Sequence, residues 1–234
     1  MDFKKKPILG MIHLSGQHVV ERAKFELDIY KEEGVHGAII ENYHSGPDML
    51  EIVLEAIDWS NYSDLLLGIN ILPNDYEKAL ELADKYNFDF IQLDNVAGTY
   101  VNNQSVDEED YLMVRQKYPN IKVLGGVWPK YYQPVAESNI KDDLESGMFR
   151  SDVVVVTGSG TGKETPLDKI KNFRSEIGDF PLIVGAGLNT DNVQEQLRIA
   201  DGAIVGSCFK PFSRTNEPVK RELVIEFMDN VKNL

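Results

Sequence analysis

Eight short apolar runs, separated by stretches with helical periodicity, constrain this sequence more than any other feature. Continuous apolar runs of this length are typical of strands that are buried on both faces. Parallel strands need a crossover helix between them, so the alternation predicts an α/β fold with a parallel sheet. The strands are expected at Ile8–Ile12, Gly37–Ile40, Leu65–Leu72, Phe88–Leu93, Ile121–Val127, Asp152–Val156, Leu182–Val184 and Ala203–Val205.

The number of strand–helix pairs favours a closed (β/α)8 barrel, that is, a TIM barrel. The chain has 234 residues, slightly fewer than the roughly 250 typical of that fold. No linker or low-complexity run divides it, so we expect a single domain over residues 1–234. A doubly wound open sheet has the same local pattern and is the alternative.

Capping residues predict where several helices begin. Asn74 is expected to be an N-cap, with Glu77 three residues later as its capping-box partner. Thr165 is expected to cap the sixth helix, with Pro166 at the first helical position. The last helix is expected from about Glu217.

The composition excludes some classes of partner. A formal net charge of −14 argues against nucleic-acid binding by broad phosphate attraction, although it permits a small phosphorylated ligand. No apolar run approaches the roughly 20 residues of a membrane span, so no membrane insertion is expected. We found no signal-peptide pattern and expect a cytoplasmic protein. The sequence is compatible with a homo-oligomer.

Two glycine-rich turns follow the last two strands and predict a phosphate site. Glycine lacks a Cβ, so backbone N–H groups in such turns can approach an anion closely. In a (β/α)8 barrel the loops after strands seven and eight frequently bind phosphate. The expected phosphate-binding residues are Gly185, Gly187, Gly206, Ser207 and Lys210.

Polar side chains follow nearly every predicted strand, at the end where barrel enzymes place their chemistry. A histidine, carboxylates and a lysine at neighbouring strand ends can transfer protons and stabilise negative charge. The expected catalytic residues are His13, Glu41, Asp94 and Lys130. The expected substrate-binding residues are Asn42, Asn70, Thr157 and Ser159.

No metal site is predicted. Glu41 and Asp94 carry oxygen ligands, but the sequence has no short metal-ligand motif, and His13, His18, His36 and His44 show no zinc spacing. The sequence does not identify a cofactor.

Seven segments in chain order share a pattern with a known family: Gly10–Leu14, Gly37–Asp48, Gly68–Asp75, Phe90–Gly98, Val156–Gly162, Leu182–Val193 and Ala200–Lys210. Together they resemble the BtpA family of ribulose-phosphate-binding-type barrels. The resemblance implies a barrel. Residues of the same type as in the family are His13, Glu41, Asn42, Asn70, Lys130, Thr157, Gly158, Thr161, Gly162 and Lys210.

The chain departs from the family pattern in two places. The loop after His13 is short, with Ser15-Gly16-Gln17 where the family usually has a longer proline-rich loop. Gly126 lies where relatives usually carry an acidic residue nearby, so a mechanism that uses this acid does not transfer. Some relatives are linked to photosystem I biogenesis, and that role does not transfer from sequence alone.

The residues and the resemblance lead to one functional hypothesis and two alternatives. We expect an isomerase- or lyase-type enzyme that acts on a small phosphorylated metabolite, a sugar phosphate or a nucleotide-like compound. The first alternative is a non-catalytic assembly or regulatory protein that keeps the barrel. The second is a flavin or nucleotide binder that uses the same phosphate loops.

Overall fold

The computed structural model describes residues 1–43, 45–101 and 106–232. The strands are β1 (Ile8–His13), β2 (Gly37–Glu41), β3 (Leu66–Asn70), β4 (Phe90–Ala97), β5 (Lys122–Val127), β6 (Val153–Val156), β7 (Leu182–Val184) and β8 (Gly202–Val205). The α-helices are α1 (Val19–Glu32), α2 (Pro47–Ala56), α3 (Tyr76–Lys85), α4 (Glu108–Arg115), α5 (Ile140–Arg150), α6 (Leu167–Ile177), α7 (Val193–Leu197) and α8 (Arg221–Val231). Short 3-10 helices are η1 (Phe3–Lys5), η2 (Trp59–Tyr62), η3 (Ser207–Phe209) and η4 (Pro211–Ser213).

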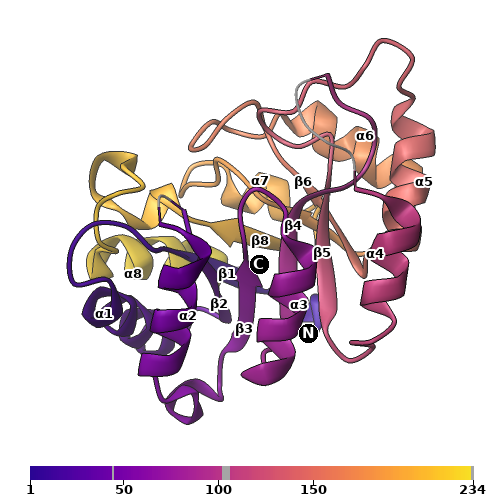
Figure 1. Cartoon of the computed structure of the whole chain (residues 1–234). Coiled ribbons are helices and arrows are strands. Elements are labelled where there is room, and N and C mark those ends of the chain that lie inside the picture. The colour runs from indigo at the N-terminus through magenta and orange to yellow at the C-terminus, as the bar shows by residue number, and fades with distance from the viewer. Residues whose placement is uncertain (44, 102–105, 233–234) are drawn as a thin grey trace.

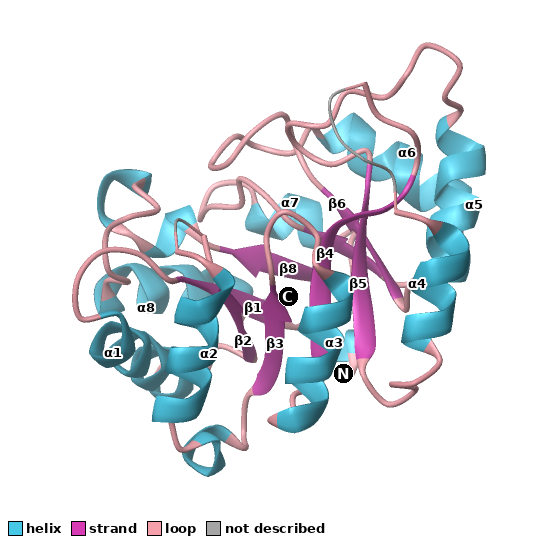
Figure 2. Ribbon diagram, viewed as in Figure 1, coloured by secondary structure: helices cyan, strands magenta, loops and turns pink. Residues whose placement is uncertain are grey.

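The strands form one closed barrel. They are neighbours in chain order from β1 to β8, and β8 pairs in parallel with β1. Figures 1 and 2 show the helices around the outside of the strands. The predicted (β/α)8 barrel is confirmed, and the doubly wound open sheet is wrong.

The barrel has a core inside the ring of strands and a second core between strands and helices. The inner core contains Leu9, Met11, Ile39, Phe90, Leu124, Val153, Val155, Ile183 and Ile204. Side chains alternate along a strand, so the residue two positions after an inner core residue also faces inward. His13 follows Met11, and Glu41 follows Ile39, at this spacing. The last inward layer of the barrel is therefore polar.

Strand β4 is longer than predicted. The sequence places Asp94 and Asn95 in a loop, whereas the strand continues to Ala97. Its pairing with β5 is irregular between Leu93 and Ala97. The Asp94 carbonyl lies so close to Gly126 that a Cβ added there would be 1.9 Å from it. The missing side chain at Gly126 thus lets β4 approach β5 at the level of Asp94.

Two predicted caps are wrong. Helix α3 is capped by Asp75, whose Oδ1 accepts from the Lys78 N–H at 3.0 Å, while the Asn74 side chain donates to the Asn95 carbonyl at 2.8 Å. Thr165 does not cap α6, because its hydroxyl donates to the Ala186 carbonyl at 2.9 Å. Asn74 instead connects its loop to β4, and Thr165 connects its loop to the one after β7.

The last helix also begins later than predicted. It starts at Arg221 rather than near Glu217. The Glu217 carbonyl accepts a hydrogen bond of 2.5 Å from Arg22, so this stretch is held as a loop against α1.

Gly68→Ala tests how tightly the inner core is packed. An added Cβ would lie 2.1 Å from Cε2 of the fully buried Phe90 ring, so the ring or the strand must shift. We expect a loss of about 1–3 kcal/mol in the free energy of unfolding, measured by urea denaturation. Gly160→Ala is the control, because its added methyl would meet only ordinary contacts of 3.5 Å and more. Equal stability of both variants would contradict this packing.

Candidate active site

The carboxyl ends of the strands and the loops after them surround one pocket. Its lining includes eight of the predicted site residues: His13, Glu41, Asp94, Lys130, Gly185, Gly187, Gly206 and Ser207. Sheet register explains part of this arrangement, since His13 pairs with Glu41 across β1 and β2, and Glu41 pairs with Asn70 across β2 and β3. The predicted acid, base and glycine turns therefore face the same space.

His13 is buried and has polar or aromatic neighbours on several sides. Its Nδ1 lies 2.9 Å from Nζ of Lys210, and its Nε2 lies 3.7 Å from Oε1 of Glu41. The Tyr43 ring is tilted against the imidazole, with the ring centroids 4.7 Å apart. These contacts fix the orientation of the imidazole ring.

Glu41 is a buried carboxyl group, 7% exposed, at the end of β2. Its Oε2 accepts a hydrogen bond of 2.9 Å from Nδ2 of Asn70. Burial, and then the nearby Asp94, raises the pKa of Glu41 to about 7, while Lys130 and Lys210 oppose the rise. A carboxyl group that titrates near neutrality can both take up and return a proton.

Asp94 faces the same pocket from β4. Burial raises the pKa of its carboxyl group, and Lys130 and a hydrogen bond from Asn70 oppose this. The Asn70 amide thus interacts with both carboxyl groups. Lys130 is positioned by its backbone, because its N–H donates to the Thr157 hydroxyl at 2.7 Å.

The glycine turns differ in whether their backbone N–H groups already donate hydrogen bonds within the protein. The Gly185 N–H donates to the Val156 carbonyl at 2.8 Å, so it is engaged within the protein. In the described part of the chain, no acceptor is recorded for the N–H groups of Gly187, Gly206 and Ser207. Gly187 has φ of +71°, and a Cβ there would lie 2.1 Å from the Lys163 carbonyl oxygen. These three N–H groups are the candidate hydrogen-bond donors to a bound anion.

Five predicted site residues do not line the pocket. The Asn42 side chain accepts from the Leu72 N–H at 2.8 Å. Asn70 binds Glu41, and Thr157 binds the Lys130 N–H. The side chain of Ser159 is exposed. Lys210 is 1% exposed and lies behind His13, where Nζ also donates to the Thr215 carbonyl at 2.9 Å.

Tyr43 and Gln92 are among the pocket residues that the site prediction does not include. Each lies two positions from a predicted site residue, Tyr43 after Glu41 and Gln92 before Asp94. The two-residue repeat of a strand could have found Gln92, whose buried Oε1 has no hydrogen-bond partner among the described residues. Tyr43 follows β2 in a loop, where no such repeat applies.

Within residues 1–43, 45–101 and 106–232, no group of three or more His, Cys, Asp or Glu is arranged to hold a metal ion. The same residues include no helix with the length and apolar character needed to cross a membrane. His44, which the sequence analysis considered among possible zinc ligands, lies outside them.

The fold and pocket define a closed α/β barrel in which a histidine, two carboxyl groups, a lysine and two glycine turns surround one pocket at the carboxyl ends of the strands. The chain belongs to the BtpA family, whose sequence model matches residues 4–233.

Two relatives and one solved structure illustrate the similarity. An uncharacterised protein of Thermococcus kodakarensis is 31% identical, over 100% of this chain and 98% of its own length. The photosystem I biogenesis protein BtpA of Synechocystis is 25% identical, over 95% of this chain and 88% of its own length. N-(5'-phosphoribosyl)anthranilate isomerase of Pyrococcus furiosus has a TM-score of 0.64 at 17% identity, over 98% of this chain and all of its own.

The raised pKa of Glu41 predicts a pH-dependent stability. A carboxyl group whose pKa is higher in the folded state contributes stability at low pH, and this is lost as pH rises from about 4.5 through about 7. Glu41→Gln removes the ionisation, so the variant should gain up to about 3 kcal/mol relative to the wild type between about pH 4.5 and pH 8. Urea denaturation at several pH values measures this difference.

Glu55→Gln is the matched control, because that side chain is 65% exposed and pairs with Lys85 at 3.7 Å. Its stability relative to the wild type should change little with pH. If the Glu41→Gln difference is just as insensitive to pH, Glu41 does not have the environment described above.

Proposed function

We propose that this protein is an enzyme that transfers a proton next to a carbonyl group of a small phosphorylated metabolite, as an isomerase or lyase does. The supporting observation is that His13, Glu41, Asp94 and Lys130 line the same pocket as the glycine turns after β7 and β8. A pocket that contains both proton-transfer groups and N–H donors to an anion suits a substrate with a reactive carbon at one end and a phosphate at the other.

The phosphate would bind the N–H groups of Gly187, Gly206 and Ser207. A Cβ at Gly206 would lie 3.1 Å from Cε1 of His13, so this turn passes directly beside the imidazole. A phosphate held there places the rest of a short substrate over His13 and Glu41. The overall charge of −14 does not prevent this, because backbone donors act locally.

Glu41 is the candidate base. It would take the proton from the carbon beside the carbonyl, and the C–H electron pair would move into an enediolate whose oxygen becomes negative. Lys130 would stabilise this charge. In an isomerase the protonated Glu41 would return the proton to the former carbonyl carbon, the hydroxyl on the adjacent carbon would become the new carbonyl, and the proton of that hydroxyl would pass to the negative oxygen. Burial, together with Asp94, would keep the pKa of Glu41 close to neutrality.

Similar proteins support the proposal to different extents. The Pyrococcus furiosus structure is an isomerase of a phosphoribosyl compound, and its 17% identity supports the fold alone. The Synechocystis relative is named for photosystem I biogenesis, which favours the non-catalytic alternative. An assay of the reaction itself distinguishes the two.

Solvent exchange tests the proposed chemistry without knowledge of the full reaction. The protein is incubated in D2O with a panel of aldose and ketose phosphates, and deuterium beside the carbonyl is measured by NMR. We expect the wild type to exchange deuterium into at least one compound. For Glu41→Gln we expect the exchange rate to fall by roughly 100-fold or more. The exposed Glu55→Gln variant should exchange like the wild type. A sugar phosphate that binds without any exchange would favour the non-catalytic alternative.

Gly206→Val tests the phosphate site. A bulky side chain beside His13 would block the approach of an anion to the Gly206 and Ser207 N–H groups. We expect calorimetric affinity for ribose 5-phosphate to fall by about tenfold or more, which corresponds to about 1.4 kcal/mol. Gly160→Ala is again the control. If the folded Gly206→Val protein binds ribose 5-phosphate with unchanged affinity, the phosphate does not bind at this turn.

A further inference from the structure

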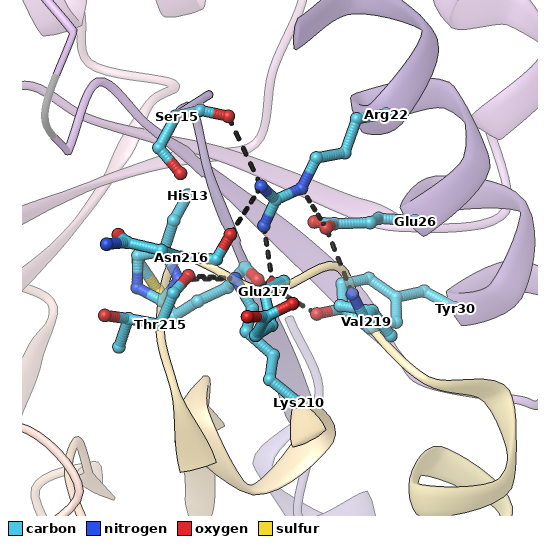
Figure 3. Close-up of polar contacts among 11 residues, drawn as sticks. His13, Ser15, Arg22, Glu26, Tyr30, Lys210, Thr215, Asn216, Glu217 and Val219 are labelled. Atoms are coloured by element: carbon cyan, nitrogen blue, oxygen red, sulfur yellow. Dashed lines mark hydrogen bonds and ion pairs between the residues drawn. The ribbon is translucent and has the colours of Figure 1, made fainter. Parts of the chain in front are cut away.

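We propose that Lys210 is a positioning residue that sets the tautomer of His13, so that the imidazole is neutral and carries its proton on Nε2. The contact is direct, with Lys210 Nζ 2.9 Å from His13 Nδ1 (Figure 3). Nδ1 faces Lys210, and Nε2 is the ring nitrogen near Glu41. The importance of this tautomer for catalysis rests on the proposed function, whereas the tautomer itself does not.

The chemistry of the pair determines which atom donates. A lysine ammonium has donors and no acceptor. When it contacts an imidazole nitrogen, that nitrogen must therefore be the acceptor and cannot hold a proton. Burial lowers the pKa of Lys210 to about 8, and Glu26 and Glu41 oppose that shift, so the ammonium form still dominates at neutral pH.

Thr215 supports both neighbours of the imidazole. Its carbonyl accepts from Lys210 Nζ at 2.9 Å, which fixes the ammonium opposite Nδ1. Its hydroxyl lies 2.8 Å from the hydroxyl of Tyr43, whose ring packs against His13. The position of this one residue therefore affects the imidazole from two directions.

An ion pair on α1 holds the chain around Thr215. Arg22 donates to the carbonyls of Asn216 at 2.8 Å and Glu217 at 2.5 Å (Figure 3). Glu26 is fully buried, and its Oε1 accepts from Arg22 Nε at 2.8 Å and from the Val219 N–H at 3.1 Å. These contacts anchor residues 216–219 to the helix that follows His13, and so they hold the adjacent Thr215, whose carbonyl binds Lys210.

The tautomer divides the catalytic roles. A neutral imidazole with its proton on Nε2 donates a hydrogen bond from the side of the ring near Glu41, so it would stabilise the enediolate oxygen without becoming the base. Glu41 is then the group that takes the carbon-bound proton. Two residues that the sequence leaves equivalent as acid or base thereby acquire different roles.

Nitrogen NMR of the full chain with labelled histidine tests the proposal. At neutral pH the wild type should show His13 with the pattern of the Nε2–H tautomer, assigned by its loss in His13→Gln. Lys210→Met removes the donor to Nδ1, so we expect that pattern to give way to a mixture of tautomers or to protonated imidazole. Lys6→Met is the matched control, because Lys6 donates to the Ala200 carbonyl at 3.3 Å and should leave the His13 signals unchanged.

The wild-type spectrum decides the question even if Lys210→Met fails to fold. His13 with its proton on Nδ1, or doubly protonated, overturns the proposal, as does a folded Lys210→Met protein with the wild-type pattern. No substrate is needed. Failure of the tautomer assignment is therefore separate from failure of the exchange assay, which tests the proposed reaction.

Discussion

The register of the parallel strands is the constraint on which the pocket depends. His13, Glu41 and Asn70 are partners across three successive strands, and all three are inward-facing ends of their strands. A shift of one residue in either pairing would turn a polar end toward the helices and place an apolar residue in the pocket. Barrel closure thus fixes both the apolar interior and the polar layer above it.

That layer places ionisable groups where water is scarce. Burial disfavours the charged forms of Glu41, Asp94 and Lys210, as the directions of their pKa shifts indicate. The protein offsets this with specific neighbours, such as the Asn70 amide on Glu41 and the Thr215 carbonyl on Lys210. Buried ionisable groups with pKa values shifted in this way are suited to proton transfer, and they contribute less to stability than apolar residues would.

Much of the barrel could be predicted from the sequence, because apolar runs mark each strand and strand ends mark the pocket. The sequence pattern identifies His13, Glu41 and Gly206 in this way. It places Asp94 in a loop because the pattern of β4 becomes polar before the strand ends. The partner of Lys210 lies 197 residues away in the sequence, so local patterns carry no information about the contact. The pattern also identifies Asn42 and Thr157 as polar strand ends, but their contacts with loop backbone depend on how neighbouring loops meet.

The contact of Arg22 with the carbonyls of Asn216 and Glu217 has a consequence for the molecule as a whole. It joins α1, the first α-helix, to the segment that leads into α8, where β1 and β8 pair to close the barrel. The first and final units of the barrel are therefore coupled beside His13. Disturbance of the C-terminal helix would reach the imidazole through this contact, although none of the residues of that helix lines the pocket.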